Sequence, residues 1–252
     1  MLTVAVLQQK GGSGKTTLAI NLAAAAHLEG KRALVVDMDR QGSAFDWSAA
    51  RKDGSPLDGL AVVRADRAIA LARFKEIARG YDYVFLDGPP RLGDITQSAA
   101  VVADVALLPI QPGPFDFWAV AETLESLDVA DQIREQLGRR PIRRAFVLNR
   151  AGTNTRLARE AETELRKSGG ELAGVVRQRV AFPDAASQGE SVFTTRSGEP
   201  AADDIQRLWS KLKGGKHGSQ SEETKQGKDR AKREEGGGEA RRGGEAHRRG
   251  RA

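Results

Sequence analysis

The sequence predicts an α/β protein in three layers, with a doubly wound, mostly parallel sheet of seven to eight strands between helices. Three observations support this fold class. Short runs rich in valine, leucine and isoleucine alternate with longer amphipathic segments. The run 101–110 is apolar almost throughout, which is typical of a parallel strand covered on both faces. Carboxylates follow several of the runs, where open α/β sheets bind ligands.

Seven runs are expected as strands of one sheet, and six segments are expected as helices. The strands are placed at 2–8, 32–37, 60–64, 83–87, 105–109, 142–149 and 174–177. The helices are placed at 15–29, 66–79, 94–103, 115–137, 156–168 and 201–213. Signals at the helix ends support this placement: Gly30, Gly80 and Gly138 follow three of the helices, and Pro200 precedes the last.

Residues 214–252 differ in composition from the rest of the chain. They contain ten glycines, eleven lysines or arginines and seven acidic residues. They contain no valine, isoleucine, leucine, methionine, phenylalanine, tryptophan or tyrosine. Such a segment cannot offset its ordering entropy by burial. We therefore expect one folded domain over 1–213 and a disordered, glycine-rich, charged tail over 214–252.

Composition excludes several kinds of site. The chain has no cysteine, so disulfides, thiolate metal sites and iron–sulfur clusters are ruled out. It shows neither an apolar stretch of membrane-spanning length nor a charged-then-apolar leader, so we expect a cytoplasmic protein without a membrane partner. The net charge of +6 favours a polyanionic partner, although the mixed signs make this a weak signal.

The segment K-G-G-S-G-K-T-T at 10–17 lies between an apolar run and an alanine-rich helical pattern. A strand, a glycine-rich loop and a helix in this order form a phosphate-binding loop, whose backbone N–H groups surround phosphates while a hydroxyl binds Mg²⁺. Lys15 and Thr16 supply that in-loop cation and hydroxyl. Gln9 stands where the usual pattern has its first glycine, and Lys10 adds a second cation. The loop therefore predicts a nucleotide and Mg²⁺ as cofactors, and the family resemblance given below implies that the nucleotide is ATP.

Three aspartates follow predicted strands. Asp37 and Asp39 come after the second strand, and Asp87 closes the fourth, directly before Gly88. A carboxylate after an apolar strand near a phosphate-binding loop holds Mg²⁺ directly or through water. We expect Asp39 to orient the attacking water, Asp37 to support the metal shell, and Asp87 to report the γ-phosphate through the Gly88 backbone. A helix cap or turn is the alternative for any one of these acids.

These motifs resemble those of the ParA/MinD group of deviant Walker P-loop ATPases. The resemblance rests on the segment 10–17, on D-M-D-R-Q-G at 37–42 and on F-L-D-G-P-P at 85–90. It extends to L-P-I-Q-P-G-P-F-D-F-W-A at 108–119 and V-L-N-R at 147–150, which are similar to small ParA proteins without an N-terminal helix-turn-helix domain. It covers 2–212, nearly the whole predicted domain.

The resemblance implies roles for two further residues. Lys10 is the signature lysine that crosses a dimer interface and contacts the nucleotide of the other subunit, so it couples ATP binding to a sandwich homodimer. Asn149 is similar to the residue that hydrogen-bonds adenine, with a turn-forming asparagine as the alternative. Arg40 departs from the family, which commonly has proline at this position, and this leaves the stiffness of the loop and the hydrolysis rate open.

The expected site residues fall into three sets. Nucleotide contacts are expected from Gly11, Gly12, Ser13, Gly14, Lys15, Thr16, Thr17, Asp87, Gly88 and Asn149. Magnesium ligands are expected from Thr16, Asp37, Asp39 and Asp87. Catalytic roles are expected for Lys10, Lys15 and Asp39.

The resemblance also implies a biological role, namely a slow ATPase that positions or segregates a cargo on the nucleoid. The ATP-bound dimer binds non-specific DNA, and a ParB-like or other cargo adaptor stimulates hydrolysis and release. Candidate DNA contacts are Arg177, Arg179, Arg207 and Lys211, for each of which a solvated surface charge is the alternative. Two other functions stay open: an accessory ATPase that binds a defined DNA site, and a metabolic ligase similar to dethiobiotin synthetase.

Overall fold

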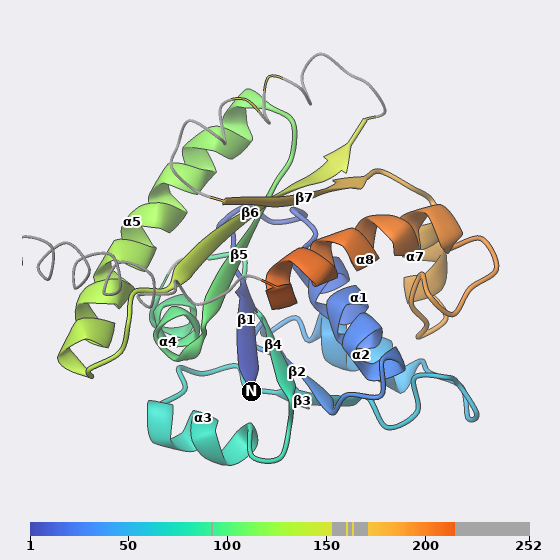
Figure 1. Cartoon of the computed structure of the whole chain (residues 1–252), viewed down its shortest axis with the longest axis horizontal. Helices are drawn as coiled ribbons and strands as arrows, with labels where there is room; N and C mark the ends of the chain where they lie inside the picture. The colour runs from blue at the N-terminus through green and yellow to red at the C-terminus, as the bar shows by residue number, and fades with distance from the viewer. Residues whose placement is uncertain (92, 153–159, 161–162, 164–170, 215–252) are drawn as a thin grey trace, which may run out of the picture. The chain divides into compact units, whose positions relative to one another are not determined.

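The computed structural model describes residues 1–91, 93–152, 160, 163 and 171–214, with residues 114–119 described by their backbone alone. Seven strands in these residues form one sheet in which every neighbouring pair is parallel (Figure 1). Their order is β3-β2-β4-β1-β5-β6-β7. The strands are β1 Leu2–Val6, β2 Ala33–Asp37, β3 Ala61–Arg64, β4 Tyr83–Asp87, β5 Val105–Ile110, β6 Arg143–Ala151 and β7 Glu171–Arg177.

Helices cover both faces of this sheet, which confirms the predicted three-layer α/β fold (Figure 1). One layer packs on the core that contains Leu18, Trp47 and Trp209, and the other packs on the core that contains Phe74 and Leu127. The first layer holds α1 Lys15–Leu28, α2 Ser43–Ala49, α7 Ala181–Ala186 and α8 Glu199–Gly214. The second layer holds α3 Leu71–Ile77, α4 Asp94–Val102 and α5 Pro114–Gln136.

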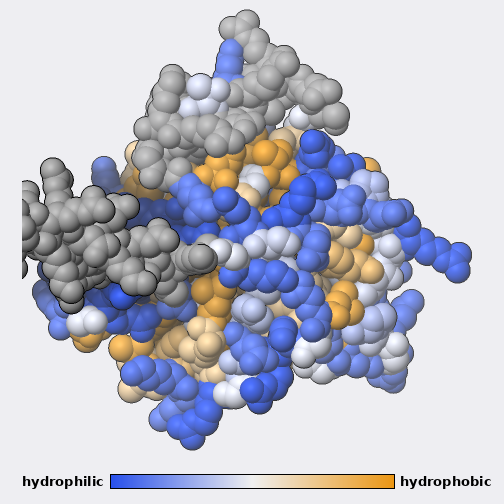
Figure 2. Space-filling model, viewed as in Figure 1, coloured by the Kyte–Doolittle hydropathy of each residue, from blue (hydrophilic) through white to orange (hydrophobic). Residues whose placement is uncertain are grey.

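Burial along the strands explains their sequence. Every residue of β2 and β5 is buried, as expected of strands covered on both faces, whereas the edge strand β3 has no fully buried residue. The outer faces of the helices are polar, and Figure 2 shows hydrophilic residues spread over the viewed face with smaller apolar areas between them. In the described part of the chain, no helix combines the length and apolar character needed to cross a membrane.

The elements differ from the prediction in several places. β7 begins three residues before its predicted start, and β6 ends two residues after its predicted end. Two short helices, α2 and α7, were not predicted, because segments of seven and six residues show no helical periodicity. The second predicted helix begins later, at Leu71, because the preceding segment crosses to α4, where the Ile69 N–H donates to Ser98 Oγ at 3.1 Å and the Ile69 side chain is buried. The helix predicted at 156–168 lies outside the described residues, as does the predicted tail beyond 214, so both stay predictions.

Candidate functional site

The phosphate-binding loop joins β1 to α1 at the carboxyl edge of the sheet. β1 pairs with β4 on one side and β5 on the other, and the helices that follow β1 and β4 lie on opposite faces. Open α/β sheets bind ligands in the crevice that this change of direction creates. Gly12 and Gly14 have left-handed φ angles of 72° and 93°. A Cβ on Gly14 would also lie 2.2 Å from Asn149 Nδ2, so this position requires glycine.

Two amide side chains hold the loop by its carbonyl oxygens. Gln111 Nε2 donates to the Gly12 carbonyl at 3.0 Å, and Asn149 Nδ2 donates to the Ser13 carbonyl at 2.7 Å. Gln111 follows β5 and Asn149 belongs to β6, so the loop is fastened to the strands on one side of β1. Engaging carbonyls in this way favours a loop conformation that offers its N–H groups to an anion.

The two loop lysines are linked to each other. Lys15 Nζ donates to the Lys10 carbonyl at 3.3 Å, and the Lys15 residue is only 7% exposed. Burial lowers the pKa of Lys15 from its usual 10.5, while the carboxylates of Asp87 and Asp39 oppose this shift. Lys15 therefore lies among acids with its ammonium partly desolvated, a setting in which contact with a phosphate is strongly favoured.

Asp87 is the most unusual carboxylate of the site. It lies at the end of β4, opposite Val6 of β1, and it is fully buried. Within the described residues, neither of its carboxylate oxygens has a hydrogen-bond partner of normal geometry. Burial raises the pKa of Asp87 to about 7, although the nearby Thr16 hydroxyl and Lys15 ammonium act in the opposite direction. Two buried oxygens in this condition fit a Mg²⁺ ion or the water bound to it.

The described residues offer Mg²⁺ a small set of possible protein ligands and not a preformed cluster. Across the described portion of the chain, no three histidine, aspartate or glutamate side chains gather where they could hold a metal ion. Mg²⁺ in phosphate-binding loops keeps several waters and takes further ligands from the phosphates, so one hydroxyl and one or two carboxylates are enough. Thr16 and Asp39 line the same cavity next to the loop, so a hydroxyl and a carboxylate are available there as ligands.

Asp37 has a different environment, because both of its oxygens accept backbone N–H groups. Oδ1 accepts from Asp39 at 3.1 Å, and Oδ2 accepts from Phe45 at 3.0 Å. Asp37 is fully buried, and burial raises its pKa. Since Phe45 lies in the first turn of α2, Asp37 fastens the loop after β2 to the N-terminus of that helix. Its predicted role as a metal ligand stays a prediction.

Hydrogen bonds also restrain the loop that carries Asp39. Asp39 Oδ1 accepts the Gln41 N–H at 3.1 Å, and Arg64 Nη2 at the end of β3 donates to the Arg40 carbonyl at 2.9 Å. The Arg40 residue itself is exposed. The position where the family commonly has proline is thus held by a side chain from the neighbouring strand.

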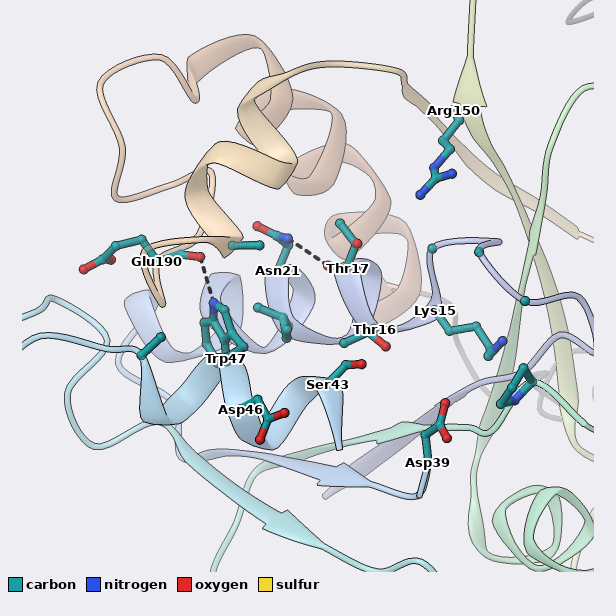
Figure 3. Close-up of a pocket in the computed structure, with 17 residues that line it drawn as sticks. Lys15, Thr16, Thr17, Asn21, Asp39, Ser43, Asp46, Trp47, Arg150 and Glu190 are labelled. Atoms are coloured by element: carbon teal, nitrogen blue, oxygen red, sulfur yellow. Dashed lines mark hydrogen bonds between the residues drawn. The ribbon is translucent and has the colours of Figure 1, made fainter. Parts of the chain in front are cut away.

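Two cavities adjoin the phosphate-binding loop. The larger, of about 520 Å³, contains Lys15, Thr16 and Asp39, and Figure 3 shows their side chains converging at one end of it. The smaller, of about 340 Å³, contains Asn149 and lies against β7 and α7. Both cavities share Gly14, Thr17, Arg150 and Ala186.

The remaining predicted nucleotide contacts divide into lining and supporting residues. Gly11, Gly12 and Thr17 line the larger cavity, whereas Ser13 is buried behind the loop. Gly88 packs on β1: its N–H donates to the Val6 carbonyl at 3.1 Å, and a Cβ there would lie 2.7 Å from Leu7 Cδ2. Glycine is therefore required here because the chain packs closely on β1. Contact of the Gly88 backbone with the γ-phosphate, the reason expected from the sequence, stays a prediction.

Sequence reasoning missed the helices that complete the cavities. Ser43, Asp46 and Trp47 of α2 line the larger cavity, and Trp47 Nε1 donates to the Glu190 carbonyl at 3.0 Å at its far end (Figure 3). Phe182 of α7 lines the smaller one. The sequence contained no periodic signal for either helix, although the large apolar side chain of Trp47 is of a kind that is mostly buried.

Three of the four candidate DNA contacts form ion pairs with one carboxylate. They are Arg177, Arg179 and Arg207. The shared partner is Asp204 of α8, whose side chain is 0% exposed. Lys211 instead pairs with Glu171 at 3.6 Å. The cluster leaves net positive charge at the surface, and its role in binding DNA stays a prediction.

Comparison with known proteins identifies the family. Residues 4–192 match the CobQ/CobB/MinD/ParA nucleotide binding domain. The chain belongs to this family. It is 31% identical over 212 residues to maintenance of carboxysome distribution protein A from Halothiobacillus neapolitanus, covering 82% of this chain and 94% of that protein. It is 32% identical over 233 residues to the chromosome-partitioning ATPase Soj from Thermus thermophilus, covering 81% and 92% respectively.

A solved structure confirms the fold of this ParA/MinD-type domain. The MinD cell division protein from Aquifex aeolicus superposes with a TM-score of 0.66, covering 86% of this chain and 99% of that chain at 22% identity. The family predicted from the sequence motifs is therefore confirmed, and the P-loop ATPase fold with it.

Proposed function

We propose that this chain is a ParA-like ATPase that binds ATP with Mg²⁺, closes into a dimer around two ATP molecules and uses hydrolysis to position or segregate a cargo. The observation that carries the proposal is the meeting of the phosphate-binding loop, Asp39 and the unpaired Asp87 at the ends of β1, β2 and β4. Hydrolysis of a phosphoanhydride needs charge neutralisation and an oriented water, and this site offers residues for both.

The two cavities support a placement for the nucleotide. The phosphates occupy the larger cavity along the loop, with Lys15 exchanging its bond to the Lys10 carbonyl for the β and γ phosphates. The base occupies the smaller cavity beside Asn149. Because Asn149 Nδ2 is engaged by the loop, its Oδ1 is the atom that accepts a hydrogen bond from the adenine amino group.

The metal site and the water site use neighbouring residues. The Thr16 hydroxyl and the Asp87 carboxylate hold Mg²⁺ or its waters, and Asp37 fixes the adjacent loop. When bound, Mg²⁺ neutralises charge on the phosphates. Asp39 is half-buried at the cavity wall and orients the water for attack, while Lys15 stabilises charge that develops on the phosphoryl oxygens.

In the proposed cycle, Lys10 couples ATP binding to dimerisation. It begins the loop, and its side chain is the second cation of the motif. A triphosphate enclosed between two subunits carries more negative charge than one lysine per site compensates, so a lysine from the other subunit stabilises the closed state. Hydrolysis is slow in the absence of a cargo adaptor, and the adaptor stimulates it.

The names of the two relatives support a positioning role. One is a protein for carboxysome distribution and the other is a chromosome-partitioning ATPase. These cargoes differ, which is consistent with an ATPase cycle that is independent of cargo chemistry. We propose that the dimer binds nucleoid DNA without sequence preference in the cytoplasm, through the arginines around Asp204.

Fluorescence anisotropy with a labelled duplex of random sequence tests this function. Binding should require ATP and Mg²⁺, disappear with ADP, weaken steeply with salt and be lost to excess unlabelled DNA. Arg207→Ala should weaken it, whereas Arg73→Ala on α3, a residue of similar side-chain exposure (70% against 63%), should not. Binding to one duplex that survives excess random DNA would indicate a defined site and overturn the positioning role.

A further inference from the structure

Strand β6 contains one extra residue where it reaches the candidate site. Leu148 pairs with Val175 and Ala151 pairs with Arg177, so three steps along β6 match two along β7. This irregularity is a β-bulge, and Arg150 lies within it. Bulges next to binding sites turn a side chain away from the direction that the regular strand would give it.

The backbone of Arg150 is strained. Its φ angle is 51°, and it is the one non-glycine residue with positive φ in the part of the chain that the structure describes. Arginine has no local hydrogen bond that favours this conformation, unlike asparagine or aspartate. Backbone strain of this kind persists where surrounding structure enforces it, and it is concentrated at functional sites.

The strained backbone places the Arg150 side chain at the junction of the two cavities. Of the four residues that line both, it is the one with a charge; the others are Gly14, Thr17 and Ala186. Figure 3 shows the side chain extending from the end of β6 toward the phosphate-binding loop. The residue is exposed, and its guanidinium has no carboxylate partner among the described residues, whereas Arg177 and Arg179 pair with Asp204.

We propose that Arg150 is a nucleotide-binding residue that contacts the α-phosphate, at the point where the ribose leads from the phosphates to the base. This inference rests on the proposed ATPase function. With phosphates in one cavity and the base in the other, the α-phosphate lies at their junction. An unpaired guanidinium presents a planar fork of donors that matches phosphate oxygens. ATP and ADP both carry an α-phosphate, so Arg150 stabilises both nucleotides equally.

Three substitutions separate the guanidinium from the backbone. Arg150→Ala removes the guanidinium and keeps the backbone cost, while Arg150→Gly removes both. Arg140→Ala is the control, because Arg140 is an exposed arginine just before the opposite end of β6. Isothermal titration of the full chain with ADP and with ATP should give dissociation constants raised about tenfold in both Arg150 variants. The rise should be equal for the two nucleotides, and Arg140→Ala should match the parent protein.

Each other outcome decides against the inference. A loss in Arg150→Ala that Arg150→Gly restores assigns the effect to the backbone and overturns a guanidinium contact. A loss confined to ATP places Arg150 at the γ-phosphate and overturns the α-phosphate assignment. Unchanged affinity in both variants, with binding still abolished by Lys15→Ala, overturns this inference alone. A parent protein that binds neither nucleotide overturns the proposed function itself.

Discussion

Asp87 and Asp204 are both fully buried aspartates, yet their surroundings are opposite. Asp87 lies in the half of the carboxyl edge formed by β1, β2 and β4. Among the described residues, its oxygens have no hydrogen-bond partner of normal geometry, although the Thr16 hydroxyl and the Lys15 ammonium are nearby. Asp204, behind the half formed by β6 and β7, accepts three arginines and the Arg177 backbone N–H. A buried charge is tolerated when it is paired, so Asp204 is a structural group. The unpaired Asp87 is suited to a ligand that arrives later.

The same contrast extends along the edge of the sheet. Asp37, Asp39 and Asp87 make the β2–β4 half acidic, while Arg150, Arg177 and Arg179 make the β6–β7 half basic. In the proposed placement, Mg²⁺ and the phosphates lie toward the first half, in the cavity with Asp39, and the base lies toward the second half, beside Asn149.

The largest effect is expected from Asp39→Ala in the acidic half. Removing the group that orients the water should lower steady-state phosphate release by about 10²–10⁴-fold. ATP binding should persist, because Lys15 and the loop remain. Phosphate release measured with a coupled assay checks this, with Glu76→Ala on the exposed face of α3 as the control. Undiminished turnover in Asp39→Ala would remove Asp39 from the proposed mechanism.

In the basic half, Asp204→Ala should destabilise the fold. Its loss leaves three guanidinium groups close together and the partly buried Arg177 N–H without an acceptor, at a cost of about 3 kcal/mol in the free energy of unfolding. Urea denaturation monitored by circular dichroism measures this. Asp203→Ala, the exposed neighbour on the same helix, should change the stability by less than about 0.5 kcal/mol. Equal values for the two variants would contradict a structural role for Asp204.

The smallest effect is expected from Asp87→Asn in the absence of nucleotide and metal. Burial raises the pKa of Asp87 to about 7, so folding favours the protonated acid. Its contribution to stability is present below the unfolded pKa, near 3.9, and is lost as the pH rises through 7. Asp87→Asn should therefore melt a few degrees above the parent protein at pH 8, with a smaller difference at pH 5. A lower melting temperature at pH 8 would show that the charge is compensated.

Sequence reasoning located the loop and the strands well, because each has a local signal. Residues 10–17 form a spaced motif, and buried parallel strands such as β5 appear as continuous apolar runs. Gly30, Gly80 and Gly138 were predicted to end helices, and all three have positive φ. β4 pairs with β1, and β2 pairs with β4, so the acids after these strands lie at the same edge of the sheet as the loop, while their roles stay predictions.

The features that were missed depend on long-range packing. The short helix α2 exists because Asp37 holds its first turn and Trp47 packs under it, which no local periodicity reveals. Gln111 reaches back 99 residues to the loop. The bulge at Arg150 arises from the register between β6 and β7, and a sequence does not display register.

Light scattering of the full chain tests whether Lys10 makes ATP a signal for dimerisation. The measurement uses the Asp39→Ala background, so that ATP survives during the experiment. We expect a dimer in ATP with Mg²⁺ and a monomer in ADP. Adding Lys10→Ala should leave a monomer in both, with ADP affinity close to that of the parent. A dimer that persists in ATP without Lys10 would contradict this role.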